Sequence, residues 1–150
     1  MTVTDLKDKF LIREYRDGDF DGIALLWDLT EMGNSDRGDN KGIIEDTIKM
    51  GGTLLVLEEK STGMISGTSW MTFDGRRILL HHFGILPQFQ GNGLSNMLLE
   101  QSLKFVKSKG FQVKLEAHSH NFKAINLYKK FGFKQLKGYN VFIIRDILNL

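Results

Sequence analysis

Residues 85–95 of the chain read ILPQFQGNGLS. Two apolar residues lead into Pro87, the single proline of the sequence, and two glycines then precede a long segment with helical periodicity. The first turn of a helix has unpaired N–H groups and the positive end of the helix dipole, and glycines let a phosphate approach the backbone closely. The stretch therefore predicts an anion-binding turn between a strand and a helix.

Taken alone, this pattern fits an ordinary strand-to-helix turn equally well. Two familiar phosphate-binding loops fit poorly. No lysine followed by serine or threonine comes directly after the second glycine, as a P-loop requires, and only two of the three glycines of a dinucleotide fingerprint are present.

The segments around this turn predict a mixed order of strands and helices. Before the turn we expect a strand over Phe10–Tyr15, a helix capped by Asp17 or Asp19, a helix over Gly42–Met50, and strands over Thr53–Glu59, Met64–Phe73 and Arg77–Leu86. After it we expect a helix from about Asn92 to Ser108, a strand over Gln112–Ala117, a helix over Asn121–Phe131, and a closing hairpin of residues 133–137 and 139–148 around Gly138. Short turns between the three middle strands predict an antiparallel meander.

Composition limits the class of protein. With 150 residues and an apolar fraction of 41%, the chain is long enough for one core, so we expect a single domain. A net charge of +2 does not indicate a nucleic acid or membrane partner. The absence of cysteine excludes disulfides, thiolate metal sites and a cysteine nucleophile. The first ten residues lack the apolar run of a signal peptide and no later run is long enough for a membrane span, so we expect a cytoplasmic protein.

Residues 90–95 resemble the acyl-CoA pyrophosphate loop of the GNAT superfamily of N-acetyltransferases. That loop begins with glutamine or arginine, has glycine at its fourth position and ends in glycine or alanine. Gln90 and Gly93 match, Gly91 fits a frequent additional glycine, and Ser95 departs from the pattern but is small. A second segment, residues 121–133, is similar to the family's asparagine, alanine, leucine-tyrosine, glycine-phenylalanine segment through Asn121, Ala124, Leu127, Tyr128, Gly132 and Phe133.

The resemblance implies a mixed α/β (α+β) fold of GNAT type, with a central, mostly antiparallel sheet flanked by helices. In this fold CoA parts the sheet between the strands Arg77–Leu86 and Gln112–Ala117. It also implies transfer of an acetyl group from acetyl-CoA to a primary amine of a small molecule or peptide, by direct attack in a ternary complex. The alternative from another class is a non-catalytic acyl-CoA-binding sensor or interaction module.

The same resemblance assigns the CoA-binding residues. Backbone groups at the splayed strand end would hold pantetheine and the acetyl carbonyl, the glycine turn would bind pyrophosphate through its N–H groups, and an asparagine would meet the pantetheine arm. The residues concerned are Phe83, Gly84 and Ile85 for the first role, Gln90, Gly91, Asn92, Gly93, Leu94 and Ser95 for the second, and Asn121 for the third.

Two residues are candidates for proton transfer. The resemblance gives Tyr128 the protonation of the departing sulfur, which suits a phenol with an ordinary pKa of about 10; its helical spacing with Leu127 and Phe131 also fits a packing residue. His81 is the candidate general base, because strand alternation places it on the side of Phe83 and Ile85, with His82 on the other side.

Other routes for the proton stay open. His118 or His120 could serve as the base instead, or the proton could leave through water. A structural role for both members of the His81–His82 pair fits the sequence equally well. Histidines without carboxylates at metal-ligand spacing make a zinc site a poor fit, so we expect no metal.

The acidic stretch Glu31–Asp46 lies where the family usually builds its acceptor-binding loop. It favours a cationic acceptor such as a polyamine, an aminoglycoside or a basic peptide end, with Asp36 and Asp39 as candidate contacts. The sequence is compatible with a monomer and with a homodimer, and it leaves the acceptor and the acyl chain length open.

Overall fold

The computed structural model describes residues 6–150. These residues form two compact units, one ending at Glu116 and the other covering Ala117–Leu150. None of the helices within residues 6–150 combines the length and the apolar character that crossing a membrane requires.

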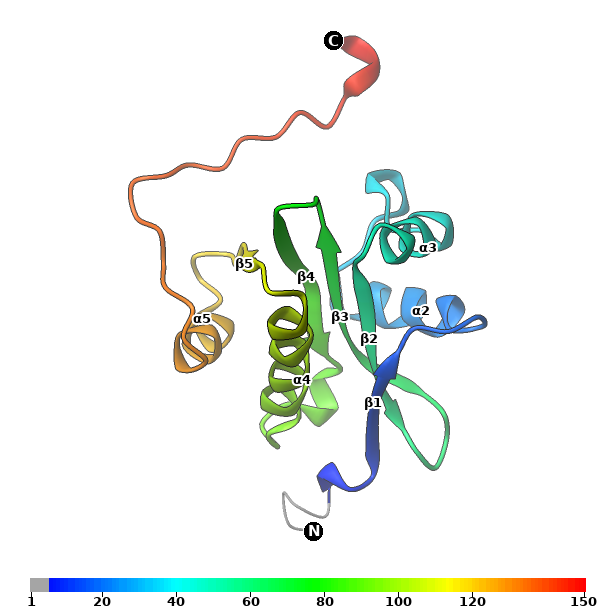
Figure 1. The fold of residues 1–150 in the computed structure, drawn as a ribbon. Coiled ribbons are helices and arrows are strands. Elements are labelled where there is room, and N and C mark those ends of the chain that lie inside the picture. The colour runs from blue at the N-terminus through cyan, green and yellow to red at the C-terminus, as the bar shows by residue number, and fades with distance from the viewer. Residues whose placement is uncertain (1–5) are drawn as a thin grey trace. The chain divides into compact units, whose positions relative to one another are not determined.

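The first unit contains a five-stranded mixed sheet (Figure 1). Its first four strands pair antiparallel in chain order, and the last strand is parallel to the fourth. The predicted meander and the mostly antiparallel sheet are therefore confirmed, with strand ends within two residues of those expected. The strands are β1 (Phe10–Glu14), β2 (Thr53–Glu59), β3 (Ile65–Phe73), β4 (Arg77–Ile85) and β5 (Gln112–Leu115).

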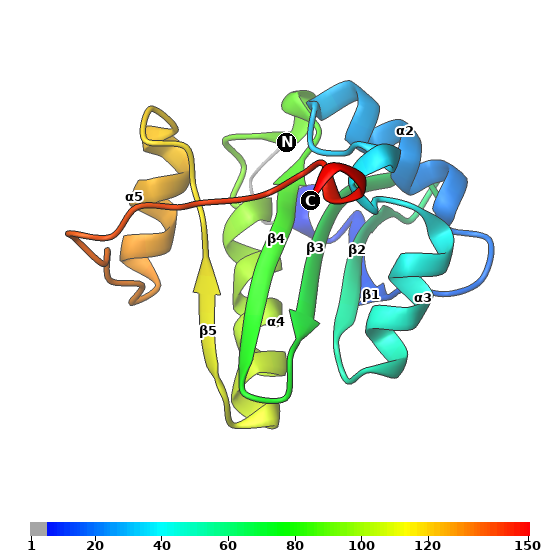
Figure 2. The ribbon, with the colours of Figure 1, turned by 90° about the horizontal axis from the view of Figure 1, so that it is seen from above.

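Helices cover both faces of this sheet (Figures 1 and 2). They are α2 (Phe20–Thr30) and α3 (Lys41–Lys49) on one face and α4 (Leu94–Lys109) on the other. Neighbouring residues of β3 show the alternation that a strand imposes. The Ser69 hydroxyl lies 2.7 Å from that of Ser102 in α4, whereas the Trp70 ring stacks at 5.6 Å on Trp27 of α2.

Asp19 joins the start of α2 to the sheet. It occupies the position before the helix, as expected, but its carboxylate does not cap the helix. It accepts hydrogen bonds of 2.8 and 2.9 Å from Arg13 of β1 and one of 2.8 Å from the Arg16 N–H. Burial raises the pKa of Asp19, but these hydrogen bonds outweigh it and leave the pKa lowered. The carboxylate is thus held ionised, and it links α2 to the edge of the sheet.

The second unit contains α5 (Phe122–Lys130) and no strand in its described residues. The Asn121 side-chain oxygen Oδ1 caps the helix by accepting the Ala124 N–H at 3.3 Å. The predicted closing hairpin over residues 133–148 was wrong. A β-strand needs a partner for its N–H and C=O groups, and in this unit no described segment pairs with those residues. The side chains of Val141–Ile144 are 60–89% exposed as a result.

Candidate functional site

β4 carries a bulge at His82. Thr68 pairs with Gly84 and Trp70 pairs with His81, so the single residue between them on β3 faces two residues of β4. His82 has a φ of 45°, which lies in the left-handed region. That conformation costs a residue with a side chain about 1–2 kcal/mol. An extra residue of this kind interrupts the alternation of side chains along a strand.

The bulge brings both histidines to one face of the sheet. The His81 ring lies 4.6 Å from the Trp70 ring, and the His82 ring lies 4.5 Å from Trp27 and 5.1 Å from Trp70. Both tryptophans belong to the core beneath α2 and α3. The expectation that His81 and His82 point to opposite sides was wrong, because it assumed unbroken alternation.

An acidic residue completes the group. The His81 and His82 Nδ1 atoms are 2.7 Å apart, and His82 Nε2 lies 3.1 Å from Asp39 Oδ1. This contact is a close approach of the Asp39 carboxylate to the ring, because no aligned hydrogen bond reaches His82 Nε2 from the described residues. The Asp39 side chain is only 12% exposed.

Backbone and side-chain hydrogen bonds fix these residues. The Asp39 Oδ2 atom accepts the Asn34 N–H at 2.6 Å, which holds the loop before α3. On the sheet side, the Thr68 hydroxyl donates to the His82 carbonyl at 2.7 Å and accepts the Trp27 indole N–H at 2.9 Å. The loop, α2 and β3 therefore jointly hold His82 in its unfavourable backbone conformation.

The pKa of His81 is strongly perturbed. Burial is the main cause of its fall from 6.5 to about 4; electrostatic repulsion from a cation on His82 acts in the same direction, and Asp39 acts in the opposite direction. His81 is therefore neutral at pH 7 and has a nitrogen lone pair available. As a base acting alone it would be weak, because a cation on its ring is poorly solvated.

The ladder between β4 and β5 is short. It joins Arg77–Leu80 to Gln112–Leu115, and the described pairing ends there. The predicted CoA-binding residues Phe83, Gly84 and Ile85 lie beyond that end, next to the bulge. A Cβ on Gly84 would lie 3.0 Å from the Met32 sulfur, so the glycine also permits close packing under α2.

The glycine turn follows β4 and a short 3-10 turn over Pro87–Phe89. Gly91 and Gly93 have φ values of 80° and 79°, which disfavour other residues there. The Asn92 side chain bridges back to the Phe89 and Gln90 carbonyls at 3.4 and 3.1 Å, and Gln90 Nε2 donates to the Ile85 carbonyl at 3.3 Å.

The turn leaves the start of α4 suited to an anion. The helix begins at Leu94, two residues later than expected, and Gly93 at its N-cap supplies no side-chain cap. Its first turn has no acidic residue, while Lys107 and Lys109 lie in its last turn. No acidic residue of the first turn of α4 thus neutralises the positive end of the helix dipole.

The second unit holds the other predicted residues. Tyr128 lies on α5 with its ring 5.7 Å from that of Phe133, and burial raises the pKa of Tyr128 to about 12. Its phenol is therefore protonated at any physiological pH. Asn121 is the N-cap of the same helix. His118 and His120 are exposed, with their rings 5.4 Å apart.

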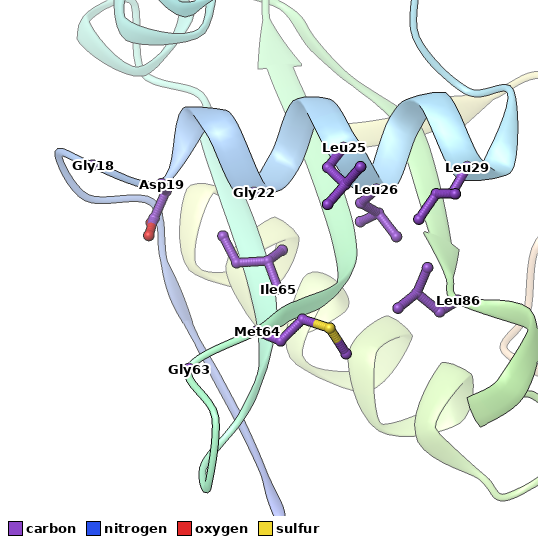
Figure 3. Close-up of a pocket in the computed structure, with 10 residues that line it drawn as sticks. All are labelled: Gly18, Asp19, Gly22, Leu25, Leu26, Leu29, Gly63, Met64, Ile65 and Leu86. Carbon is purple, nitrogen blue, oxygen red and sulfur yellow. The ribbon is translucent and has the colours of Figure 1, made fainter.

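A pocket of about 200 Å³ lies elsewhere, between α2 and the turn from β2 to β3 (Figure 3). Leu25, Leu29 and Met64 line it together with Leu86. None of the predicted catalytic or CoA-binding residues lines this pocket. Among residues 6–150, no group of three or more metal-ligating side chains is placed to hold a metal ion.

The sequence did not reveal the contact between Asp39 and His82. The two residues are far apart along the chain, and sequence reasoning placed Asp39 with the acceptor. In β4 the pairs Leu79–Leu80 and His81–His82 each consist of identical residues, so a shift of the alternation by one residue leaves no visible break in the sequence pattern. The adjacent pair His81–His82 was the only local signal.

Known proteins resemble this chain in sequence pattern and in fold. The model of the acetyltransferase (GNAT) family matches residues 20–133. A GNAT-family acetyltransferase from Staphylococcus aureus has a TM-score of 0.75 and 16% identity, with 86% of each chain covered.

Two further structures extend the comparison. Glucosamine-6-phosphate N-acetyltransferase from Arabidopsis thaliana has a TM-score of 0.66 and 24% identity, with 89% of this chain and 99% of that one covered. A putative acetyltransferase from Salmonella typhimurium, solved with its cofactor acetyl-CoA, has a TM-score of 0.68 and 21% identity, with 84% of this chain and 80% of that one covered. At these identities the similarity concerns the fold.

The low pKa of His81 predicts a pH-dependent stability. Between pH 4 and pH 6.5 His81 is protonated in the unfolded chain but not in the folded chain. The free energy of unfolding therefore decreases as the pH falls from 6.5 to 4. The pKa difference corresponds to about 3 kcal/mol. We expect urea unfolding at pH 7 and pH 4 to show a smaller loss of stability in His81→Asn than in the wild type. Equal losses in both proteins would contradict the buried, neutral His81.

Proposed function

The chain belongs to the GNAT family of acetyltransferases, and on that premise we propose that it transfers an acetyl group from acetyl-CoA to a primary amine of a small molecule or peptide. The proposed reaction is direct attack in a ternary complex. The observation that carries the proposal is the family match together with the uncapped glycine turn at the start of α4. The proposal treats residues 1–150 as one functional domain in the cytoplasm, acting as a monomer or a homodimer.

The proposed CoA site uses the residues at the end of β4 and the turn after it. Backbone N–H groups of Gln90–Ser95 would hold the pyrophosphate, and the backbone of Phe83–Ile85 would hold the pantetheine and the acetyl carbonyl. Two observations support this assignment: the N-cap residue Gly93 supplies no side-chain cap to α4, and the described ladder between β4 and β5 ends at Leu80. A neighbour solved with acetyl-CoA supports the choice of cofactor. Asn121 is assigned to the pantetheine arm by resemblance alone.

In the proposed reaction the acceptor nitrogen attacks the thioester carbonyl carbon and a C–N bond forms. His81 Nε2 accepts the proton that the nitrogen loses, which its neutral state at pH 7 permits. The C–S bond then breaks and the thiolate takes a proton from the Tyr128 phenol. The products are an N-acetylated amine and free CoA. The raised pKa of Tyr128 means that the phenol carries its proton when the C–S bond breaks. Because an ordinary thiol has a pKa of about 8.5, the phenolate left behind is the stronger base and regains its proton from water.

The acceptor is proposed to be a small amine or a basic peptide end. A neighbour named for a phosphorylated amino sugar supports the small-molecule class. The proposal that the acceptor is cationic is based on the acidic residues of Glu31–Asp46. Asp39 is no longer counted among the candidate acceptor contacts, because its carboxylate contacts His82. No metal takes part in the proposal.

The direct experiment measures CoA release from acetyl-CoA with a panel of amines, and mass spectrometry identifies the acetylated product. Polyamines, aminoglycosides, amino sugars and basic peptides should be compared with neutral amines of similar size. We expect amine-dependent CoA release with a mass gain of one acetyl group on the acceptor. Tight acetyl-CoA binding without product for any amine would favour a non-catalytic acyl-CoA-binding module.

Replacing Tyr128 with phenylalanine tests the proton donor. Because the phenol acts only as the thiolate leaves, kcat should fall by about 100-fold while the Kd for acetyl-CoA changes less than about twofold. Tyr139→Phe is the control, since its side chain is 80% exposed. Full activity in Tyr128→Phe would remove the residue from the mechanism and leave it a packing role.

Replacing Gly93 with leucine tests the pyrophosphate turn. A side chain there would obstruct the phosphate, so acetyl-CoA should bind at least about tenfold more weakly, or by about 1.4 kcal/mol. Gly75→Leu is a matched control, because Gly75 has a φ of 92° with open space around its Cβ position in the turn from β3 to β4. Both variants carry backbone strain, so equal affinities in titration calorimetry would show that the turn does not bind CoA.

A further inference from the structure

We propose that Asp39, His82 and His81 form a proton relay, in which the proton accepted at His81 displaces a second proton onto His82 and leaves the positive charge beside the Asp39 carboxylate. The inference rests on the proposed function, because it concerns the base of that reaction. It assigns roles to two residues that the reaction scheme above leaves unused. His81 is the catalytic residue, and His82 and Asp39 are positioning residues that act through it.

The distances set the direction of the relay. A carboxylate 3.1 Å from His82 Nε2 favours a proton on that nitrogen. In the neutral pair His82 Nδ1 is then an acceptor, and the 2.7 Å separation requires His81 Nδ1 to be the donor. His81 Nε2 consequently holds the lone pair. The tautomer of each ring follows from its neighbour, with Asp39 at the fixed end.

The proton balance is complete along this path. The acceptor N–H bond breaks as His81 Nε2–H forms, and His81 Nδ1–H breaks as His82 Nδ1–H forms. The charge of +1 then resides on His82, next to a carboxylate of charge −1. After the product leaves, His82 returns its proton to His81 Nδ1, and His81 releases its Nε2 proton to water. No oxidant, metal or further reactant is needed.

Passing the proton on to His82 compensates for the weakness of His81 as a base. Burial disfavours a cation on this ring, whereas on His82 the cation would form an ion pair with a carboxylate that is itself only 12% exposed. The charged groups acting on His81 are His82 and Asp39. The neighbouring elements contribute uncharged Trp27, Thr68 and Trp70.

The backbone conformation of His82 also supports the relay. His82 adopts a φ of 45°, and strain in a side-chain-bearing residue persists only when its surroundings enforce it. The bulge is what lets two consecutive residues of a strand face the same side, so it allows ring-to-ring contact between them. The hydrogen bond of 2.6 Å from the Asn34 N–H to Asp39 Oδ2 keeps the carboxylate beside His82.

The first test uses Asp39→Asn, which keeps the oxygen that accepts the Asn34 N–H and removes the charge. We expect kcat to fall at least about tenfold, with KM for the amine and Kd for acetyl-CoA changed less than about twofold. Asp28→Asn is the control, because it removes the same charge from an exposed position on α2. A raised KM with unchanged kcat would place Asp39 at the acceptor instead and overturn the relay.

A double-mutant cycle with His82→Gln separates a relay from two independent structural effects. If the residues act as one unit, Asp39→Asn should lower kcat little further once His82 is replaced. If the fold-reductions in kcat of the two single variants multiply in the double variant, the two residues act independently and the relay is contradicted. Urea unfolding of each variant shows whether the fold is intact.

A readout without substrate keeps the test independent of the acetyl transfer itself. In the wild type, ¹⁵N NMR of the histidine rings should show the proton on His82 Nε2 and on His81 Nδ1 at neutral pH. In Asp39→Asn the proton on His82 should move from Nε2 to Nδ1, since the carboxylate beside Nε2 has been removed. The opposite tautomers in the wild type, or unchanged tautomers in Asp39→Asn, would overturn the relay even in an active enzyme. Expected tautomers with no acetyl transfer to any amine would instead reject the proposed function.

Discussion

The strand β4 has one residue more than its partner β3 can pair with, and the surplus is taken up at His82. This single mismatch decides which side chains meet on the face beneath α2 and α3. It brings two imidazoles together and aims one of them at the loop that carries Asp39. The hydrogen bonds from Trp27 through Thr68 to the His82 carbonyl keep the mismatch in place. The arrangement of titratable groups in the candidate site therefore depends on a local defect in the sheet.

The C-terminal part of β4 changes within a few residues from a regularly paired strand to the segment proposed to bind CoA. Up to Leu80 the strand is an ordinary member of the sheet, paired on both sides. Beyond it come the bulge, the residues proposed to hold pantetheine, and the glycine turn that starts α4 without a side-chain cap. The bulge and the glycine turn both interrupt regular strand or helix geometry, and the described ladder between β4 and β5 ends at Leu80, before them. The fold thus places the proposed proton acceptors and the proposed anion-binding backbone along one short length of chain.

Much of the first unit could be predicted from the sequence, because each of its elements has its own periodicity. The strands from Thr53 to Ile85 and the helix after Gly93 follow from alternation, turn residues and apolar stripes. Three features could not be predicted. The bulge has no signal in residue types, the Asp39–His82 contact joins distant segments, and the closing hairpin was inferred from β-forming residues such as Val141 that have no described partner in their unit. Local pattern therefore fixed the elements, while pairing and register depended on contacts distant in sequence.

The measurement that tests the central claim most directly is the melting temperature with and without acetyl-CoA, with ATP and NAD as controls. A ligand that binds only the folded state stabilises it by mass action, by about 2.7 kcal/mol at a concentration of 100 times its Kd. We predict a rise in Tm of several degrees with acetyl-CoA and none with NAD or ATP at equal concentration. No shift at millimolar acetyl-CoA would contradict the account, and a shift of equal size with ATP would indicate a site that recognises a nucleotide and not the acyl-CoA.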